Sequence, residues 1–221
     1  IVELISANNF QQDVIIRPMV YLDGESPGGS IGTTGPASLA ITAFPKSDNI
    51  LAKTGCSVQI SSWIRIPDSS MPARIKTTAN YHNGRLAEMQ SKLDGYDSCL
   101  LMNNEGYVSE GPGQCFAMIR NGVLITPDIG SDILESITRD TLLQLANSNG
   151  MKVEQRKVTR SELYLADEAF FCGSTWAVTP ITSIDRLPVA SGVVGPVTTK
   201  LKELYRMATL GENPQWVTKI N

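Results

Sequence analysis

The sequence predicts an α+β fold with much antiparallel sheet and with helices between the strands. Three observations support this prediction: short apolar runs bounded by Gly, Asn or Pro, segments with apolar residues at helical spacing, and an Asn121-Gly122 pair between two apolar runs. Hydrophobic residues make up 42% and charged residues 19% of the 221 positions, a balance typical of packed globular proteins rather than disordered chains. Folding buries roughly 70% of the unfolded surface at this length, so the chain can build a core in one or two domains.

The front of the chain contains two apolar runs separated by a Gly-rich segment. Val14 to Leu22 is typical of a strand, and Pro18 places that strand at a sheet edge or kinks it. Glu25 to Gly35 is interpreted as a flexible surface loop, because its glycines are accompanied by neither the Lys nor the following helix of a phosphate-binding loop. Ser38 to Phe44 is the second apolar run.

A polar stretch from Pro45 to Gly55 separates this front part from the rest of the chain. We therefore place a domain boundary there. Residues 1–46 form a small first unit, residues 47–55 an interdomain linker, and residues 56–221 a complete second unit.

The second unit is a series of elements defined by hydrophobic spacing and by turn signals. They are a strand over Ser57–Ile64, a helix over Thr77–Leu93, a hairpin of Ser98–Met102 with Gly106–Ser109, a hairpin of Cys115–Ile119 with Val123–Thr126, a helix over Thr138–Asn149, a strand over Lys152–Gln155, a helix over Arg160–Ala166, a strand over Glu168–Cys172 and a last helix over about Pro196–Met207. Gly95 and Gly150 end the first two helices. The Asn121-Gly122 turn is the strongest local signal, because both residues tolerate the positive φ of a two-residue hairpin.

Composition excludes several classes of partner and compartment. A net charge of −3 and a pI of about 5.3 give no electrostatic basis for binding nucleic acid or an anionic membrane. The longest charge-free stretches, Ser26–Pro45 and Ala169–Ile184, are interrupted by Gly, Pro, Ser and Thr, so neither resembles a membrane span. The four cysteines contain no C-x-x-C pair and lie mostly in apolar segments, which favours reduced thiols in the cytoplasm.

Several familiar catalytic devices are also excluded. The chain has a single histidine, His82, which we interpret as a partly solvated helix residue, so Ser-His-Asp triads and His/Cys metal clusters have no support. No G-x-G-x-x-G or P-loop pattern stands between a strand and a helix, which removes dinucleotide binding and P-loop chemistry.

A set of segments is informative through its order along the chain. The segments are Lys76-Thr-Thr-Ala-Asn-Tyr81, Gly106-Tyr-Val-Ser-Glu110-Gly-Pro-Gly, Asn121-Gly-Val-Leu-Ile-Thr-Pro127, Leu134-Glu-Ser-Ile-Thr-Arg-Asp140, Leu163-Tyr-Leu-Ala-Asp-Glu-Ala-Phe-Phe-Cys-Gly173 and Gly195-Pro-Val-Thr198. Together they resemble the fold-type IV, or class IV, pyridoxal-phosphate aminotransferases, and the branched-chain aminotransferases most closely. The resemblance runs from about Ile1 to Tyr205.

This resemblance implies a D-amino acid aminotransferase-like fold, a large cofactor-binding domain at residues 56–221, and a homodimer. Residues 1–46 would then be the remnant of a small N-terminal α/β domain, whose phosphate-clamping Arg has no counterpart in the sequence. Because the first residue is Ile1 rather than Met, we expect that something upstream has been removed.

The resemblance also implies roles for residues around the cofactor ring. Lys76, in the K-x-x-x-N-Y motif, matches the lysine that forms the Schiff base with pyridoxal phosphate. Glu110 matches the carboxylate that keeps the pyridine nitrogen protonated, and Tyr81 could donate to the phenolate oxygen. Taken alone, each residue has a plainer reading: a solvated lysine at a helix start, a surface glutamate and a half-buried core tyrosine.

Further matches concern the cofactor phosphate and the substrate. Ile137 and Thr138 match backbone contacts to the phosphate at a helix start, where unpaired N–H groups and the helix dipole favour an anion. Ser174 matches a second hydroxyl donor, and its turn with Thr175 faces the substrate carboxylate in relatives. The plain alternatives are a helix cap and a polar turn. Arg17 is a candidate substrate contact, with a surface-exposed arginine as its alternative.

The sequence departs from the family pattern near the substrate. Ile15 stands where branched-chain enzymes carry a tyrosine that helps to bind the substrate carboxylate, and residues 46–50 replace a linker that brings another tyrosine to the pocket. Thr175-Trp176-Ala177 replaces a small-small-Glu run, and Gly113-Gln114-Cys115 replaces Gly-Glu-Asn. Trp176 either narrows the substrate pocket or packs outside it.

The resemblance implies a ping-pong transaminase: Lys76 holds the cofactor, an amino substrate displaces it, the freed amine moves a proton, and a 2-keto acid reverses the steps. Two alternatives within the family are an aminodeoxychorismate lyase-like enzyme and a D-amino acid or amine transaminase. A third alternative is a non-catalytic scaffold or partner subunit, although such a protein has no chemical need for Lys76 or Glu110.

Overall fold

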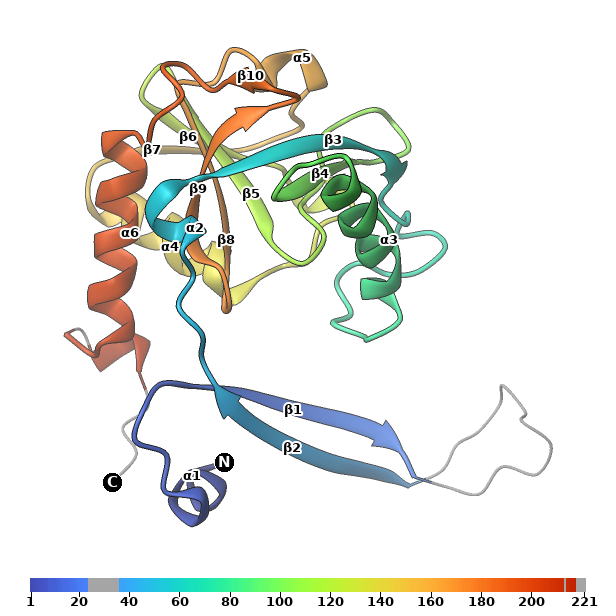
Figure 1. Ribbon diagram of the computed structural model, residues 1–221, viewed down its shortest axis with the longest axis vertical. Coiled ribbons are helices and arrows are strands. Elements are labelled where there is room, and N and C mark those ends of the chain that lie inside the picture. Colours follow the sequence, from blue (N-terminus) through green and yellow to red (C-terminus); the bar gives the residue numbers. More distant parts are fainter. Residues whose placement is uncertain (24–35, 213, 218–221) are drawn as a thin grey trace. The chain divides into compact units, whose positions relative to one another are not determined.

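The computed structural model describes residues 1–23, 36–212 and 214–217 (Figure 1). The Gly-rich segment Glu25 to Gly35, interpreted above as a surface loop, lies outside the described residues. The chain divides into two compact units, one built mainly from Ile1–Asp48 and the other from Asn49–Thr218. None of the helices in the described residues has the length and apolar character needed to cross a membrane.

The first unit is a short helix followed by a two-stranded antiparallel ribbon. Helix α1 (Val2–Asn8), which the sequence analysis did not predict, ends at Asn9 in the left-handed conformation, with φ of 49°. Strands β1 (Val14–Leu22) and β2 (Ala37–Pro45) confirm the two apolar runs and pair along their whole length. Each strand has one unpaired edge within this ribbon, which agrees with the edge position expected from Pro18.

The second unit is built on one mixed sheet. Its strands are β3 (Cys56–Ile64), β4 (Ser98–Met102), β5 (Cys115–Arg120), β6 (Val123–Thr126), β7 (Lys152–Gln155), β8 (Glu168–Gly173), β9 (Ala177–Ile184) and β10 (Leu187–Pro188). Its helices are α2 (Leu51–Thr54), α3 (Asn80–Leu93), α4 (Ile137–Ser148), α5 (Arg160–Leu163) and α6 (Pro196–Thr209), with 3-10 turns at Ile129–Ser131 and Pro214–Trp216.

The sheet order is β4-β3-β9-β8-β5-β6-β7, with β10 added to β9. Strand β3 runs parallel to β4 and β9, and β6 runs parallel to β7, whereas the other neighbours are antiparallel. The expected antiparallel pairing therefore holds at the centre of the sheet. The parallel pairs join strands that are distant in sequence, and no turn signal marks them.

Local turn chemistry produces both predicted hairpins to different degrees. The Asn121-Gly122 turn is confirmed, with φ values of 51° and 75° between antiparallel β5 and β6. The other hairpin also forms: Met102 and Val108 make an antiparallel bridge, Ser109 N donates to Leu101 O, and Leu101 N donates to Glu110 O, although only its first half is a regular strand. The side chain of Asn103 accepts hydrogen bonds from two backbone N–H groups in that turn and so closes it.

Two predicted helix boundaries were wrong. The helix expected from Thr77 begins at Asn80, because the preceding residues form tight turns such as Thr77 N–H to Ile75 O. The linker predicted at residues 47–55 contains the short helix α2. The helix expected over Arg160–Ala166 ends at Leu163 and continues as a turn. Strand β9 was missed because its Thr, Pro and Ser residues hide the apolar pattern of a strand.

Buried hydrophobic side chains form two large clusters on the sheet and a small third one, in which Ala87 of α3 packs against Cys99 and Leu101 of β4. In β5, Ala117 and Ile119 pack toward Leu142 of α4 and Leu201 of α6. The alternate residues of the strand, including Phe116, belong to the core on the other face. Helix α3 instead packs on β3 and β4, as Figure 1 shows. Helix α4 packs against β7 and β8, α6 packs against β8 and β9, and α3 covers the edge formed by β3 and β4.

Helix α3 lies against the loop after Glu110 with no room for a larger residue. A Cβ added at Gly84 would lie 2.2 Å from the carbonyl oxygen of Pro112. The wall of the cavity described below is therefore held by direct contact between backbones.

We predict that Gly84→Ala destabilises the protein by about 1–3 kcal/mol, because overpacking outweighs the gain in helix propensity of about 1 kcal/mol. Urea unfolding of both proteins measures the difference. Gly130→Ala is the control, since its new methyl group would meet only Asp128 at 3.4 Å. A Gly84→Ala protein as stable as the wild type would show that the loop moves away without cost.

Candidate active site

A cavity of about 290 Å³ opens in the second unit where the loops before α3, after Glu110, before α4 and after β8 meet. Its lining includes Arg65, Lys76, Asn80, Tyr81, Glu110, Gln114, Cys115, Ser136, Cys172, Ser174, Thr175 and Trp176. The structure therefore brings together six of the predicted site residues from separate stretches of chain. A concave site with a few convergent polar groups is the usual form of a small-molecule site.

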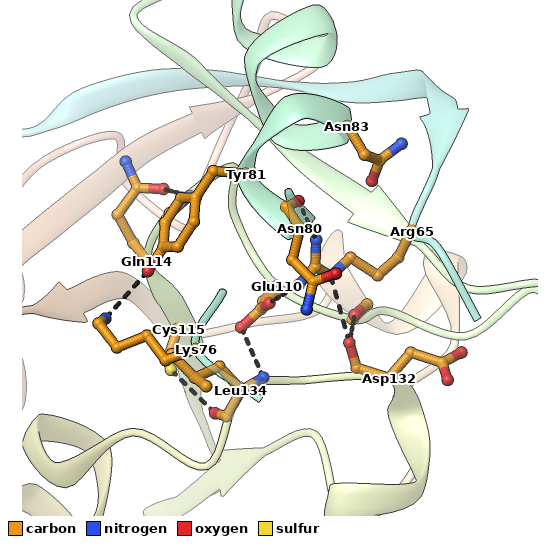
Figure 2. Close-up of polar contacts among 12 residues, drawn as sticks. Arg65, Lys76, Asn80, Tyr81, Asn83, Glu110, Gln114, Cys115, Asp132 and Leu134 are labelled. Carbon is orange, nitrogen blue, oxygen red and sulfur yellow. Dashed lines mark hydrogen bonds and ion pairs between the residues drawn. The ribbon is translucent and has the colours of Figure 1, made fainter. Parts of the chain in front are cut away.

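Lys76 and Tyr81 both line this cavity and point toward each other (Figure 2). Lys76 Nζ donates to Tyr81 Oη at 2.9 Å and lies 5.6 Å from the centre of the phenol ring. Lys76 is exposed and stands in the turn before α3, while Tyr81 is in the first turn of that helix. The amine is thus accessible to a ligand and already held by a hydroxyl group.

Glu110 is buried and paired, rather than a surface glutamate. Its Oε1 lies 2.9 Å from Arg65 Nη2, and its Oε2 accepts a hydrogen bond from Leu134 N at 3.2 Å (Figure 2). Burial raises the pKa of Glu110 to about 7, although Arg65, the Leu134 N–H and Lys76 each act to lower it. This carboxyl group can therefore hold or release a proton near neutral pH.

The start of α4 forms another side of the site. Ser136 lines the cavity, and its side-chain oxygen accepts a hydrogen bond from the backbone N–H of Arg139, as in an N-cap. The first backbone N–H groups of any helix lack acceptors within the helix, and here they belong to Ile137 and Thr138. Neither residue lines the cavity, so the structure does not bring these two predicted site residues into it.

The turn after β8 carries Ser174, Thr175 and Trp176. Trp176 packs edge-to-face against Phe171, with ring centres 5.8 Å apart, and it also lines the cavity. Its carbonyl oxygen accepts hydrogen bonds from Asn49 and Thr179. Trp176 therefore forms part of the cavity wall and does not pack outside it.

Arg17 lies in the first unit, at the middle of β1 opposite Thr42. The two units are separate bodies, so the structure does not bring Arg17 to the cavity. Its predicted contact with substrate stays a prediction.

Sequence reasoning missed three features of the cavity. The first is Arg65, the partner of Glu110, although a charged residue directly after the strand Ser57–Ile64 could have drawn attention to it. The second is the role of Asn80, which the sequence analysis names only as part of the K-x-x-x-N-Y motif and whose buried side chain holds the turn before Lys76. The third is the pair Cys115 and Cys172, which lie opposite each other on β5 and β8. Register between distant strands was needed to find that pair.

The chain is similar to proteins of a known family in both sequence and structure. The family model for amino-transferase class IV matches residues 1–184. A probable branched-chain-amino-acid aminotransferase of Aquifex aeolicus is 35% identical over 99% of this chain and 71% of its own length. The branched-chain amino acid aminotransferase of Thermobaculum terrenum in its PLP form superposes with a TM-score of 0.92 at 41% identity, covering all of this chain and 73% of that structure. The branched-chain aminotransferase of Thermoproteus uzoniensis with norvaline gives a TM-score of 0.90 at 38% identity, with the same two coverages.

We predict that Glu110 makes the protein less stable as the pH rises from about 4.5 to about 7. In this window the folded state keeps the proton and the unfolded state has lost it, so unfolding releases a proton and becomes easier with rising pH. Relative to Glu110→Gln, which cannot titrate, the wild type should lose up to about 3 kcal/mol across the window and stay level above it.

Urea unfolding at a series of pH values tests this prediction. Glu162→Gln is the control with the opposite sign, because Arg156 and Arg120 lower the pKa of Glu162 to about 2. Its wild-type advantage should be present above about pH 4.5 and disappear as the pH falls toward 2. A wild-type advantage over Glu110→Gln that grows with pH would contradict the assignment for Glu110.

Proposed function

Because this chain belongs to the class IV aminotransferase family, in its branched-chain branch, we propose that it is a pyridoxal-phosphate-dependent transaminase. It moves an amino group between an amino acid, branched-chain-like or related, and a 2-keto acid by a ping-pong route. The observation that carries this proposal is the convergence of Lys76, Tyr81 and Glu110 on one cavity. A non-catalytic scaffold has no need for an amine, a phenol and a buried carboxyl group in that arrangement.

The residues of the cavity suit pyridoxal phosphate. The cofactor supplies an aldehyde that condenses with a lysine amine and a protonated pyridine ring that draws electrons from the substrate carbon. Lys76 is the amine that reaches the cavity, and Glu110 is a buried carboxyl group whose pKa of about 7 suits a proton shared with a pyridine nitrogen. Relatives with comparable folds carry PLP or pyridoxamine 5'-phosphate in their crystal structures.

Lys76 and Tyr81 act on protons at the open end of the cavity. The Tyr81 hydroxyl accepts from Lys76 Nζ at 2.9 Å, which fixes the direction of the amine and leaves the phenolic O–H free to donate to an anionic oxygen. When the Lys76 amine is free and neutral, it acts as a general base that accepts a proton from the substrate carbon. It then acts as a general acid that gives this proton back.

Glu110 and Arg65 act at the buried end. The ionised Glu110 carboxylate favours a proton on a neighbouring ring nitrogen, and Arg65 holds that carboxylate in place. The Leu134 N–H fixes its second oxygen. Since both carboxylate oxygens are held, the group can exchange a proton without changing its position.

The candidate donors for the cofactor phosphate and the substrate carboxylate lie at the start of α4 and in the turn after β8. The N–H groups of Ile137 and Thr138 at the start of α4 and the hydroxyl of Ser174 are the candidates for the cofactor phosphate. The turn of Ser174 and Thr175 is the candidate for the substrate carboxylate, with Arg17 of the first unit as a further candidate. Trp176 forms the wall beside them and is the candidate contact for the substrate side chain.

Two further properties belong to this proposal. The protein acts as a homodimer, as its resemblance to the family implies. It works in the cytoplasm, where a reducing environment suits the four buried cysteines, which are all free thiols in the structure.

The first test is covalent capture of the cofactor. We predict that borohydride treatment after addition of pyridoxal phosphate leaves one stable adduct, located on Lys76 by peptide mass spectrometry. Lys76→Ala should lose that adduct and at least about 10²-fold in transamination rate, because no general base replaces the amine. Lys152→Ala is the control and should keep both properties, because the Lys152 side chain is 70% exposed and the residue does not line the cavity. A wild-type protein without an adduct on Lys76 would favour the scaffold alternative.

The second test concerns the size of the substrate. We predict that Trp176→Ala raises kcat/KM for amino donors with bulky side chains, relative to alanine, by about 10-fold or more, since a few methylene groups in an apolar pocket change selectivity by that amount. Trp63→Ala is the control, because Trp63 is 44% exposed and does not line the cavity. An unchanged ratio in Trp176→Ala would remove Trp176 from the substrate wall.

A further inference from the structure

We propose that Asn80 is a positioning residue, which fixes the turn before α3 so that the amine of Lys76 keeps a set direction and a set distance from Glu110. The inference rests on the proposed function, since it assigns a role in delivering that amine. Asn80 is 4% exposed and stands at the start of α3, four residues after Lys76.

The side chain of Asn80 binds the turn at two points. Asn80 Nδ2 donates to Pro72 O at 3.0 Å and to Ile75 O at 3.0 Å. The same two carbonyl oxygens accept backbone bonds from Ile75 N and Thr77 N, at 3.2 and 2.7 Å. One amide group therefore joins both turns that lead into Lys76 and determines where its backbone lies.

Few other side chains can make this pair of contacts. An Asn amide nitrogen carries two hydrogens, so a single atom can serve two carbonyl oxygens. The reversed amide would point its oxygen at both carbonyls, which fixes the assignment of the two atoms. In the observed orientation Asn80 Oδ1 is buried and has no hydrogen-bond partner among the described residues. An unsatisfied buried oxygen costs about 1–3 kcal/mol of stability. The two hydrogen bonds that Nδ2 donates explain why the side chain keeps this orientation despite that cost.

The backbone of Asn80 connects this turn to the buried end of the cavity. Arg65 Nη1 donates to the carbonyl oxygen of Asn80 at 3.3 Å, while Nη2 of the same guanidinium lies 2.9 Å from Glu110 (Figure 2). A rigid planar group thus lies between the carboxylate and the residue that holds the lysine turn. Glu110 and the turn that carries Lys76 are therefore held by one connected set of contacts.

These contacts matter because Lys76 has a long side chain and is exposed. Four rotatable bonds separate its amine from the backbone, and a flexible backbone would add to that freedom. A misplacement of about 1 Å at a reacting group costs as much as 10²-fold in rate. Tyr81 restrains the amine, and Asn80 restrains the backbone that carries it.

The test compares Asn80→Ala and Asn80→Asp with Asn83→Ala in the full chain loaded with pyridoxal phosphate. Asn80→Asp keeps the shape of the side chain but replaces both donors with acceptors. Asn83 is a matched control on the same helix: its Nδ2 donates to Ile64 O at 2.9 Å, its Oδ1 is also buried without a partner in the described part of the chain, and it does not touch the Lys76 turn. The readouts are the pH dependence of the visible absorption of the Lys76 adduct, kcat, KM and thermal unfolding.

The inference predicts that the wild type forms the adduct, and that both Asn80 variants shift its absorption titration by about one pH unit or more and lower kcat by about 10²-fold, with a smaller change in KM. Asn83→Ala should lose similar thermal stability and keep the wild-type titration. Asn80 variants with a wild-type titration and kcat would overturn the inference while the proposed function stands. No adduct on Lys76 in the wild type would overturn the proposed function and this inference together.

A measurement on the wild type alone covers the case in which the Asn80 variants do not fold. Hydrogen exchange at the amides of Ile75 and Thr77 should be as slow as in the first turns of α3, because both amides belong to the turns that Asn80 holds. Exchange at the rate of an open loop would show that the contacts are not closed in solution, and would overturn the inference.

Discussion

The buried ion pair of Arg65 and Glu110 is the interaction on which the site depends. Apart from the carboxylate, the guanidinium of Arg65 donates to the carbonyl oxygens of Asp132 and Asn80, and its backbone N–H donates to Met102 O. It therefore joins the end of β3, the end of β4, the start of α3 and the loop before α4. Burying two charges is costly unless hydrogen bonds surround them, and here most donors of the guanidinium and both carboxylate oxygens have partners. These hydrogen bonds fix the positions of Arg65 and Glu110 more narrowly than apolar packing would, because a planar guanidinium and its oxygen acceptors fit together in few arrangements.

The mixed sheet explains why these segments meet. Strand β3 runs parallel to both of its neighbours, so the chain leaves its end and enters the turn of Lys76 on the same side as the residues that follow β4, including Glu110. Strands β5 and β8 are antiparallel, so β5 begins beside the end of β8. This arrangement adds Cys115 and the turn at Ser174 to the cavity. The cavity is thus a product of strand direction, and its residues come from loops whose ends are fixed by the sheet.

The sequence predicts what is local or what recurs in a known order. The Asn121-Gly122 hairpin follows from two residues, and the elements from β5 to β8 follow from periodicity with small errors at their ends. The motif order was sufficient to select Lys76 and Glu110, which the structure brings to one cavity. Arg65 was not found, because its importance comes from a partner that lies across the fold. Strand β9 was missed for another reason: it follows β8 through a short turn, but its Thr, Pro and Ser residues hide the apolar pattern of a strand. The place of Arg17 depends on the arrangement of two units, which no local pattern contains.

The position of β9 in the sheet has a consequence for the order of folding. It lies between β3 and β8, yet it follows both of them along the chain. During synthesis β3 and β4 therefore emerge with their helix α3 long before the strand that joins them to the rest of the sheet. Contacts of high sequence separation form late and slowly, so the sheet becomes continuous only after β9 has left the ribosome. A chain stopped before Ala177 would lack the strand that joins β3 to β8.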